Sequence, residues 1–154
     1  MSIELELQIA TEAKTLPHPS QFREWVSVAL WNRIDTAELT IRIVDEVEAA
    51  QLNEDYRGKK GPTNVLSFPY EPMPGVLSRS LGDIVICAPL VGQEAEQKNK
   101  PLLDYWAHIV VHGTLHLLGY NHEEDEEAIE MQSLETEILL QLGFLPPYGD
   151  MIES

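Results

Sequence analysis

Cysteine is nearly absent from this sequence, because Cys87 is the only one among 154 residues. A single cysteine excludes an intrachain disulfide, and it excludes the paired cysteines that hold zinc in knuckle-type sites. Any bound metal ion must therefore be held by histidines and carboxylates. Cys87 itself lies in the apolar run at residues 84–88, so we expect a buried, unreactive thiol rather than a nucleophile.

Long hydrophobic runs are missing as well. No stretch approaches the roughly 20 apolar residues that a membrane helix needs, and the first residues lack the basic and apolar regions of a secretory signal. We therefore expect a soluble, cytoplasmic protein with no membrane partner. The length fits one domain, which we place at residues 1–154, and a hydrophobic share of 44% is enough for one globular core.

Positive charge is scarce and unevenly placed. The formal net charge is -16 at pH 7, which argues against binding nucleic acid through bulk electrostatics. None of the ten Lys and Arg residues lies beyond Lys100, yet Arg57, Lys59 and Lys60 fall close together. Residues 56–62, which contain two glycines and a proline, are predicted as a loop. The segment is a local basic spot on an acidic protein, and the alternative interpretation is a solvated loop with no such role.

The hydrophobic pattern predicts short strands and helices along the whole chain. Alternating apolar residues at 3–9 and 39–43 predict two strands, and compact apolar runs at 64–68 and 81–87 predict two more. The last run is the most apolar and is expected in the sheet interior. Helices are predicted at about 20–30, after Asp45, at about 89–99, at 102–118 and at about 125–142. Four strands and about five helices indicate an α+β sandwich.

Three details of these helices are specific enough to test. Ser20 is expected to cap the first helix. Asp45 and Glu48 are spaced to form a reciprocal cap at the start of the second, with Val47 turned inward. Ile129 is expected on the inner face of the last helix, which ends at a glycine.

Three histidines share the segment HGTLHLLGYNH at residues 112–122, with the spacing H-x3-H-x5-H. Residues four apart lie on one face of a helix, about 5–6 Å between Cβ atoms, so His112 and His116 can converge on one ion. Gly119 tolerates a positive φ and lets the chain leave the helix sharply, which can bring His122 to the same ion. We predict these three residues as ligands of one divalent ion, zinc, with a fourth position left for water. The alternative is three ordinary core and surface histidines.

The same spacing occurs in the H-E-x-x-H-x-x-G-x-x-H pattern of metzincin peptidases, except that Gly113 replaces the glutamate. That glutamate is the general base of the peptidases. Three neutral imidazoles can still lower the pKa of a zinc-bound water towards ~7, so hydrolysis remains expected. His108 lies one turn before His112 but about 12 Å along the axis from His116. We therefore expect His108 to be packed or to support a ligand rather than to bind the ion.

With these residues identified, the chain resembles the YbeY family of bacterial endoribonucleases, which are ribosomal RNA maturation factors. The resemblance lies in four segments: HGTLHLLGYNH, LNEDYRGKKGPTNVLSFPY from Leu52, LGDIVIC from Leu81, and the sequence Trp106-Ala107-His108. It implies a mixed four-stranded sheet flanked by helices, with a zincin-like site on a central helix. It also implies one zinc ion per chain, held by the three histidines of the first segment.

The resemblance further implies a function and partners. Family members cleave single-stranded RNA, process the 3′ end of small-subunit (16S) ribosomal RNA and act in ribosome quality control. The expected partners are therefore ribosomal RNA and the ribosome or small-subunit proteins. Asn121 stands where the family usually has Asp, and Asn64 stands where some relatives have Asp. These changes affect the surroundings of the ligands but not the ligands themselves.

Arg57 matches an arginine that faces the metal in the family, which makes it the candidate catalytic residue. Its planar guanidinium can pair two phosphate oxygens and stabilise charge that grows in the transition state. The alternative is a surface ion pair with Glu54 or Asp55. Whether water or the 2′-hydroxyl of the RNA attacks stays open, as does the group that moves the proton. Two other functions also stay open: a non-catalytic ribosome assembly factor with a structural zinc, and a metallopeptidase.

Overall fold

The computed structural model describes residues 2–71, 74–75, 79–121, 124–145 and 147. In these residues four strands and five helices follow one another in the order β1 (Ser2–Ala10), α1 (Pro19–Leu30), β2 (Thr36–Val44), α2 (Glu46–Arg57), β3 (Val65–Pro69), β4 (Ser80–Cys87), α3 (Ala88–Gln97), α4 (Leu102–Leu117) and α5 (Asp125–Gln141). The α+β class and the number of elements agree with the prediction. None of the helices in this described part is long and apolar enough to cross a membrane.

The four strands form one mixed sheet in the order β1-β2-β4-β3. β1, β2 and β4 run parallel, and β3 pairs with β4 in the antiparallel direction. The prediction that the apolar run at 81–87 lies in the sheet interior is therefore confirmed. β3 is left as an edge strand, so its outer side is available to line a site.

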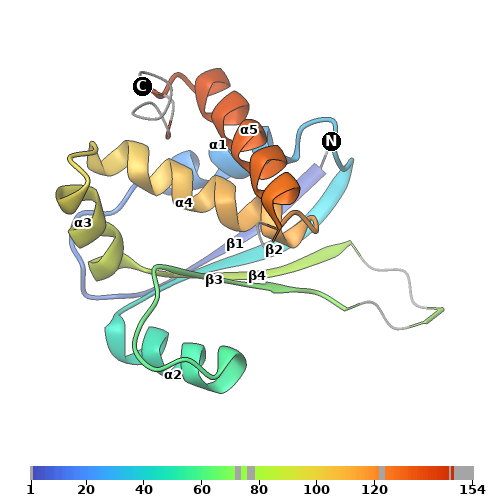
Figure 1. Ribbon diagram of the computed structural model, residues 1–154. Helices are drawn as coiled ribbons and strands as arrows, with labels where there is room; N and C mark the ends of the chain where they lie inside the picture. Colours follow the sequence, from blue (N-terminus) through green and yellow to red (C-terminus); the bar gives the residue numbers. More distant parts are fainter. Residues whose placement is uncertain (1, 72–73, 76–78, 122–123, 146, 148–154) are drawn as a thin grey trace.

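Helices cover the two faces of the sheet unequally. Figure 1 shows α1, α4 and α5 on one face and α2 on the other. The main core lies between the sheet and the larger helical layer, where Phe22 of α1 meets Trp106 of α4 edge to face with ring centroids 5.8 Å apart. A smaller apolar cluster lies under α2 and includes Cys87, which is buried as expected. Burial raises the pKa of this thiol, in keeping with an unreactive cysteine.

Two predicted helix caps are wrong. The N-cap of α1 is His18, whose Nδ1 accepts a hydrogen bond from the backbone N–H of Ser20, while the side-chain oxygen of Gln21 accepts one from the backbone N–H of His18. Pro19 sets this start, because proline suits the first helical position. Asp45 does stand before α2, but its carboxylate accepts hydrogen bonds from Thr11 and Glu12 and makes no side-chain cap.

The partner of Glu48 also differs from the prediction. Glu48 binds the guanidinium of Arg42 on β2 through two hydrogen bonds of 2.6 and 3.0 Å, so it makes no reciprocal cap. The Arg42 guanidinium lowers the pKa of this carboxyl, although partial burial acts in the opposite direction. The side chain of Glu48 therefore ties α2 to the sheet rather than to its own first turn.

Two apolar residues point outward where the sequence predicted inward. Val47 is 85% exposed and Ile129 is 65% exposed. Val47 precedes the buried Ala49 of α2 by two residues, and Ile129 precedes the buried Met131 of α5 by two residues. Two residues correspond to about 200° around a helix, so each side chain lies opposite its buried neighbour.

Candidate metal centre

α4 is the helix that carries the predicted chemistry. Ten of its 16 residues are buried, so it packs on most sides, as its apolar sequence predicts. His108, His112 and His116 recur every four residues and share one side of this helix, each only partly exposed. The helix ends at Gly119, whose φ of 104° lets the backbone turn away while the N–H of Tyr120 reaches back to the carbonyl of Leu115.

His112 and His116 are brought together as the spacing predicts. Their Nε2 atoms lie 3.0 Å apart. Two imidazole nitrogens that bind one tetrahedral zinc ion at its usual bond lengths are about 3.3 Å from each other. This donor pair therefore fits two ligands of one zinc ion. His122 lies outside the described residues, so its role as third ligand stays a prediction. Within the part that is described, no group of three or more His, Cys, Asp or Glu residues is arranged to hold a metal ion.

A buried carboxylate stands behind this histidine pair. Glu135 of α5 is only 1% exposed, and its Oε2 accepts hydrogen bonds from Nε2 of His108 at 2.8 Å and from Nδ1 of His112 at 3.1 Å. Burial by itself raises the pKa of this carboxyl, but the two imidazoles outweigh it and hold the pKa at about 2. Glu135 is therefore ionised at neutral pH.

Glu135 is not among the site residues predicted from the sequence, although the sequence contains a signal for it. Glu135 follows Met131 by four residues and precedes Ile138 and Leu139, so it falls on the apolar stripe of α5. A glutamate at such a position is rarely buried unless it is paired. The identity of its partners depends on how α5 packs against α4, which no local pattern contains.

A cleft of about 570 Å³ opens beside the two histidines along the edge strand β3. It is lined by residues from three elements and two connections: Tyr56, Arg57, Thr63, Asn64, Val65, Leu66, Ser67, Phe68, Pro69, His112, His116 and Asn121. Arg57 is thus in the same cleft as His112 and His116, although it comes from the opposite face of the sheet. Tyr56 and Phe68 meet edge to face with ring centroids 5.0 Å apart, and Tyr56 is 68% exposed.

Arg57 is the last residue of α2 and not a loop residue as the sequence suggested. The helix ends there because Gly58 adopts a left-handed conformation, with φ of 67°. The connection that follows is held by the buried Asn53, whose amide donates to the carbonyl of Gly61 at 2.8 Å. Across the described residues no ion pair joins Arg57 to Glu54 or Asp55.

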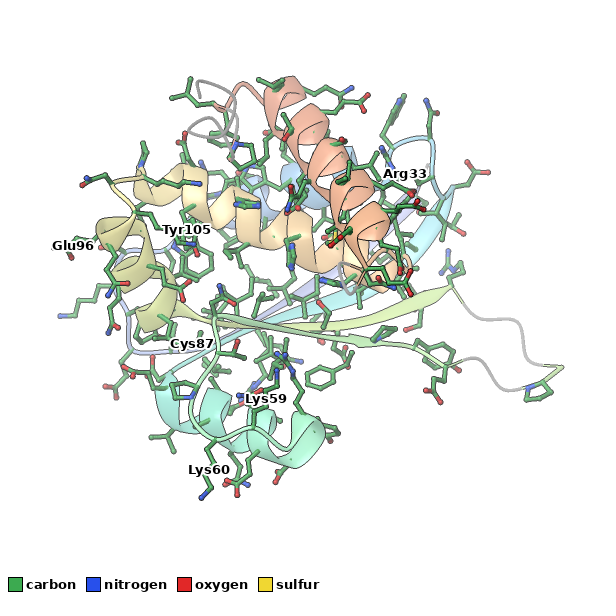
Figure 2. The ribbon with its side chains drawn as sticks, viewed as in Figure 1. Arg33, Lys59, Lys60, Cys87, Glu96 and Tyr105 are labelled. Carbon is green, nitrogen blue, oxygen red and sulfur yellow. The ribbon has the colours of Figure 1, made fainter. Side chains whose placement is uncertain are left out.

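The two lysines that follow Arg57 lie beyond this turn. Lys59 and Lys60 are exposed on the α2 side of the sheet (Figure 2), and neither is among the described residues that line the cleft. Their predicted alternatives, RNA contact or simple solvation, therefore both stay open. Arg57 is the basic residue of this segment that reaches the cleft.

Gly113 lies on the buried side of α4, against the sheet. A Cβ atom added there would lie 3.0 Å from Cγ2 of Ile84 and 3.4 Å from Oγ of Ser67. Ser67 in turn donates a hydrogen bond of 3.3 Å to the carbonyl of Gly113. At the position that carries a glutamate in metzincins, any side chain would therefore press on Ile84, which would have to give by a few tenths of an ångström.

The two asparagines differ in position. Asn121 lines the cleft beside the histidines, whereas the amide of Asn64 donates to Glu94 at 2.9 Å. Glu94 also accepts from the hydroxyl of Tyr105 at 2.7 Å, and burial together with this carboxylate raises the pKa of Tyr105. Asn64 therefore links the start of β3 to α3 and α4, which fixes one wall of the cleft.

Comparison with known proteins agrees with these features. Residues 8–143 match the family model described as Endoribonuclease YbeY. The chain is also similar to the solution structure of TM1509 from Thermotoga maritima, with 29% sequence identity, coverage of 86% of both chains and a TM-score of 0.61. The family match includes α2, β3, α4 and the described part of the cleft.

Proposed function

The chain belongs to the YbeY family of endoribonucleases, and on this premise we propose that it is a zinc-dependent endoribonuclease specific for single-stranded RNA. We place its action in 3′-end maturation of 16S ribosomal RNA and in ribosome quality control, with ribosomal RNA and the ribosome or its small-subunit proteins as partners. The observation that carries the proposal is the cleft in which Arg57 joins His112 and His116.

The metal in this proposal is one zinc ion per chain, held by His112, His116 and His122. Support comes from the two Nε2 atoms 3.0 Å apart and from the turn at Gly119, which allows the chain to double back after α4. When bound, the ion supplies Lewis-acid polarisation of a phosphodiester oxygen. Three histidine ligands leave one position of a tetrahedral zinc for the substrate or water, as in catalytic rather than structural sites.

In this proposal Arg57 binds the phosphate group of the RNA backbone. Its side chain is exposed at the end of α2 and lines the cleft with the histidines, so a phosphodiester placed in the cleft meets a fixed positive charge. The guanidinium pairs two phosphate oxygens and neutralises charge as the P–O bond is cleaved. Local charge in this cleft therefore offsets the acidic surface of the rest of the chain.

The aromatic pair in the cleft favours an unpaired strand. Tyr56 exposes most of its ring next to Arg57, and Phe68 holds it from the side. A nucleobase can stack on such a ring only when it is not stacked within a duplex, and such stacking is worth about 1–3 kcal/mol per base. Tyr56 thus supports specificity for single-stranded RNA without preference for one base.

The test combines metal analysis with cleavage of a single-stranded fragment of 16S ribosomal RNA. The wild type is expected to carry about one zinc per chain and to cleave the RNA, and a chelator is expected to abolish cleavage. His116→Ala should lose both zinc and cleavage. Arg57→Ala should keep its zinc and lose cleavage, whereas Arg23→Ala, which changes an exposed arginine of α1 outside the cleft, should keep both.

Each result separates the proposal from one of its rivals. A wild type that binds zinc but never cuts RNA, alone or with ribosomes, would favour a non-catalytic assembly factor. Cleavage that survives in Arg57→Ala would remove the role of this arginine. Peptide hydrolysis that disappears with a chelator would favour a peptidase, but Gly113 stands where that class has its general base, and it packs closely against Ile84.

A further inference from the structure

Glu135 is the most buried charged side chain near the proposed metal site, and no role has yet been given to it. It comes from α5, while the histidines that it contacts come from α4. Its Oε2 lies 3.1 Å from Nδ1 of His112 and 2.8 Å from Nε2 of His108. Burying a charged carboxylate is costly unless hydrogen bonds compensate, so these two contacts decide whether Glu135 can remain inside the protein.

These contacts determine which nitrogen of His112 carries the proton. An ionised carboxylate can only accept hydrogen bonds, so the nitrogen that faces it must donate. A neutral imidazole has one N–H group, so a neutral His112 that donates to Glu135 through Nδ1 carries its proton there. Nε2 of His112 consequently presents its lone pair, and this is the atom that lies 3.0 Å from Nε2 of His116.

From this arrangement we infer that Glu135 is a positioning residue for the zinc ligand His112: it selects the tautomer with the proton on Nδ1, orients the ring and increases the basicity of Nε2. The inference rests on the proposed function, because it requires His112 to be a ligand. A carboxylate that accepts the second N–H of a ligating histidine typically contributes 10–100-fold to metal affinity.

His108 has a different part in the same cluster. Its Nε2 faces Glu135, and the same oxygen thus receives N–H groups from two turns of α4. His108 therefore gives the carboxylate a second hydrogen bond beside that from the proposed ligand His112, which limits the positions that Glu135 can occupy. This explains why a third histidine on the helix is useful although it stands too far along the axis to share the ion with His116.

The first measurement is the zinc affinity of Glu135→Gln, obtained by competition with a chelator of known affinity. The amide keeps the shape and one acceptor oxygen but has no charge, so the fold is expected to be retained, and circular dichroism checks this. Zinc binding is expected to weaken by about 10-fold or more. Glu137→Gln makes the same chemical change on the exposed face of α5 and is expected to bind zinc like the wild type.

The second measurement needs neither zinc nor a variant. Nitrogen NMR of the metal-free wild type near pH 8, where free imidazole is mostly neutral, should show the proton of His112 on Nδ1. A proton on Nε2 would overturn the inference, and so would a folded Glu135→Gln protein that binds zinc as tightly as the wild type. If the wild type itself binds no zinc, the proposed function fails instead, so the two failures are distinguishable.

Discussion

Gly82→Ala tests how tightly the wall of the cleft is built. Gly82 lies in β4 with φ of 131°, opposite Pro69 of the edge strand β3. A Cβ atom at this position would lie 2.1 Å from the carbonyl oxygen of Phe68 and 2.9 Å from the backbone nitrogen of Tyr70. Both are backbone atoms, so the clash can be relieved only if β3 moves away from β4.

The expected loss follows from these contacts. A non-glycine residue forced into a sparsely populated backbone conformation costs about 1–3 kcal/mol. Moving β3 also weakens the hydrogen bond of 2.8 Å from Tyr70 to Leu81 and its neighbours, at about 1 kcal/mol each. We therefore expect a loss of about 3–4 kcal/mol in the free energy of unfolding, a large part of the usual total of about 5–15 kcal/mol.

Urea denaturation measures this loss as a lower midpoint. With a slope of about 1–3 kcal/mol per molar urea, the midpoint should fall by about 1–4 M. Gly92→Ala is the matched control, because Gly92 is inside α3 with no neighbouring atom within 4 Å of the added Cβ. It should gain about 0.5–1 kcal/mol from helix propensity. If Gly82→Ala stays within about 0.5 kcal/mol of the wild type, the described backbone approach is incorrect.

Three further outcomes are expected. Trp106→Ala removes a ring that is buried between α1 and α4 and should destabilise the protein by about 3–5 kcal/mol in the same urea assay, while a loss below ~1 kcal/mol would contradict this packing. Tyr56→Ala should raise KM for single-stranded RNA by about 5–150-fold, the equivalent of 1–3 kcal/mol of stacking, without loss of zinc; an unchanged KM would exclude stacking there. In the metal-free protein the pKa of Glu135 is about 2, because hydrogen bonds from two histidines outweigh its burial, against an ordinary value of 4.5. The contribution of ionised Glu135 to stability is therefore complete above about pH 4.5 and is lost as the pH falls towards 2. Between these pH values the urea midpoint should fall less with decreasing pH in Glu135→Gln than in the wild type. An equal fall in both proteins would contradict this contribution.

The sequence was most informative where one residue decides a local conformation. The predicted convergence of His112 and His116 is reproduced because a spacing of four residues is a property of the helix itself. Gly119 ends α4 with a positive φ for an equally local reason. The order of strands and helices could also be predicted, since hydrophobic periodicity reports which side of an element is buried.

Prediction from the sequence failed where distant segments decide the outcome. Glu48 has the spacing of a reciprocal cap, but both of its carboxylate oxygens accept hydrogen bonds from the guanidinium of Arg42 on β2 instead. Val47 looked like a core residue until the packing of α2 placed it in solvent. The partners of Glu135 depend on contacts between α4 and α5, and the aromatic pair of Tyr56 and Phe68 depends on how α2 faces β3.

The packing at Gly113 has an evolutionary consequence. This helix has the histidine spacing of a metzincin, and one codon change could in principle supply the glutamate of that class. A Cβ atom at residue 113 would lie 3.0 Å from Cγ2 of Ile84, so the Ile84 side chain or α4 would have to shift by a few tenths of an ångström. A shift of α4 would also displace His112 and His116 relative to Arg57. A glutamate at residue 113 is therefore coupled to the packing of the sheet against the helix that carries the histidines.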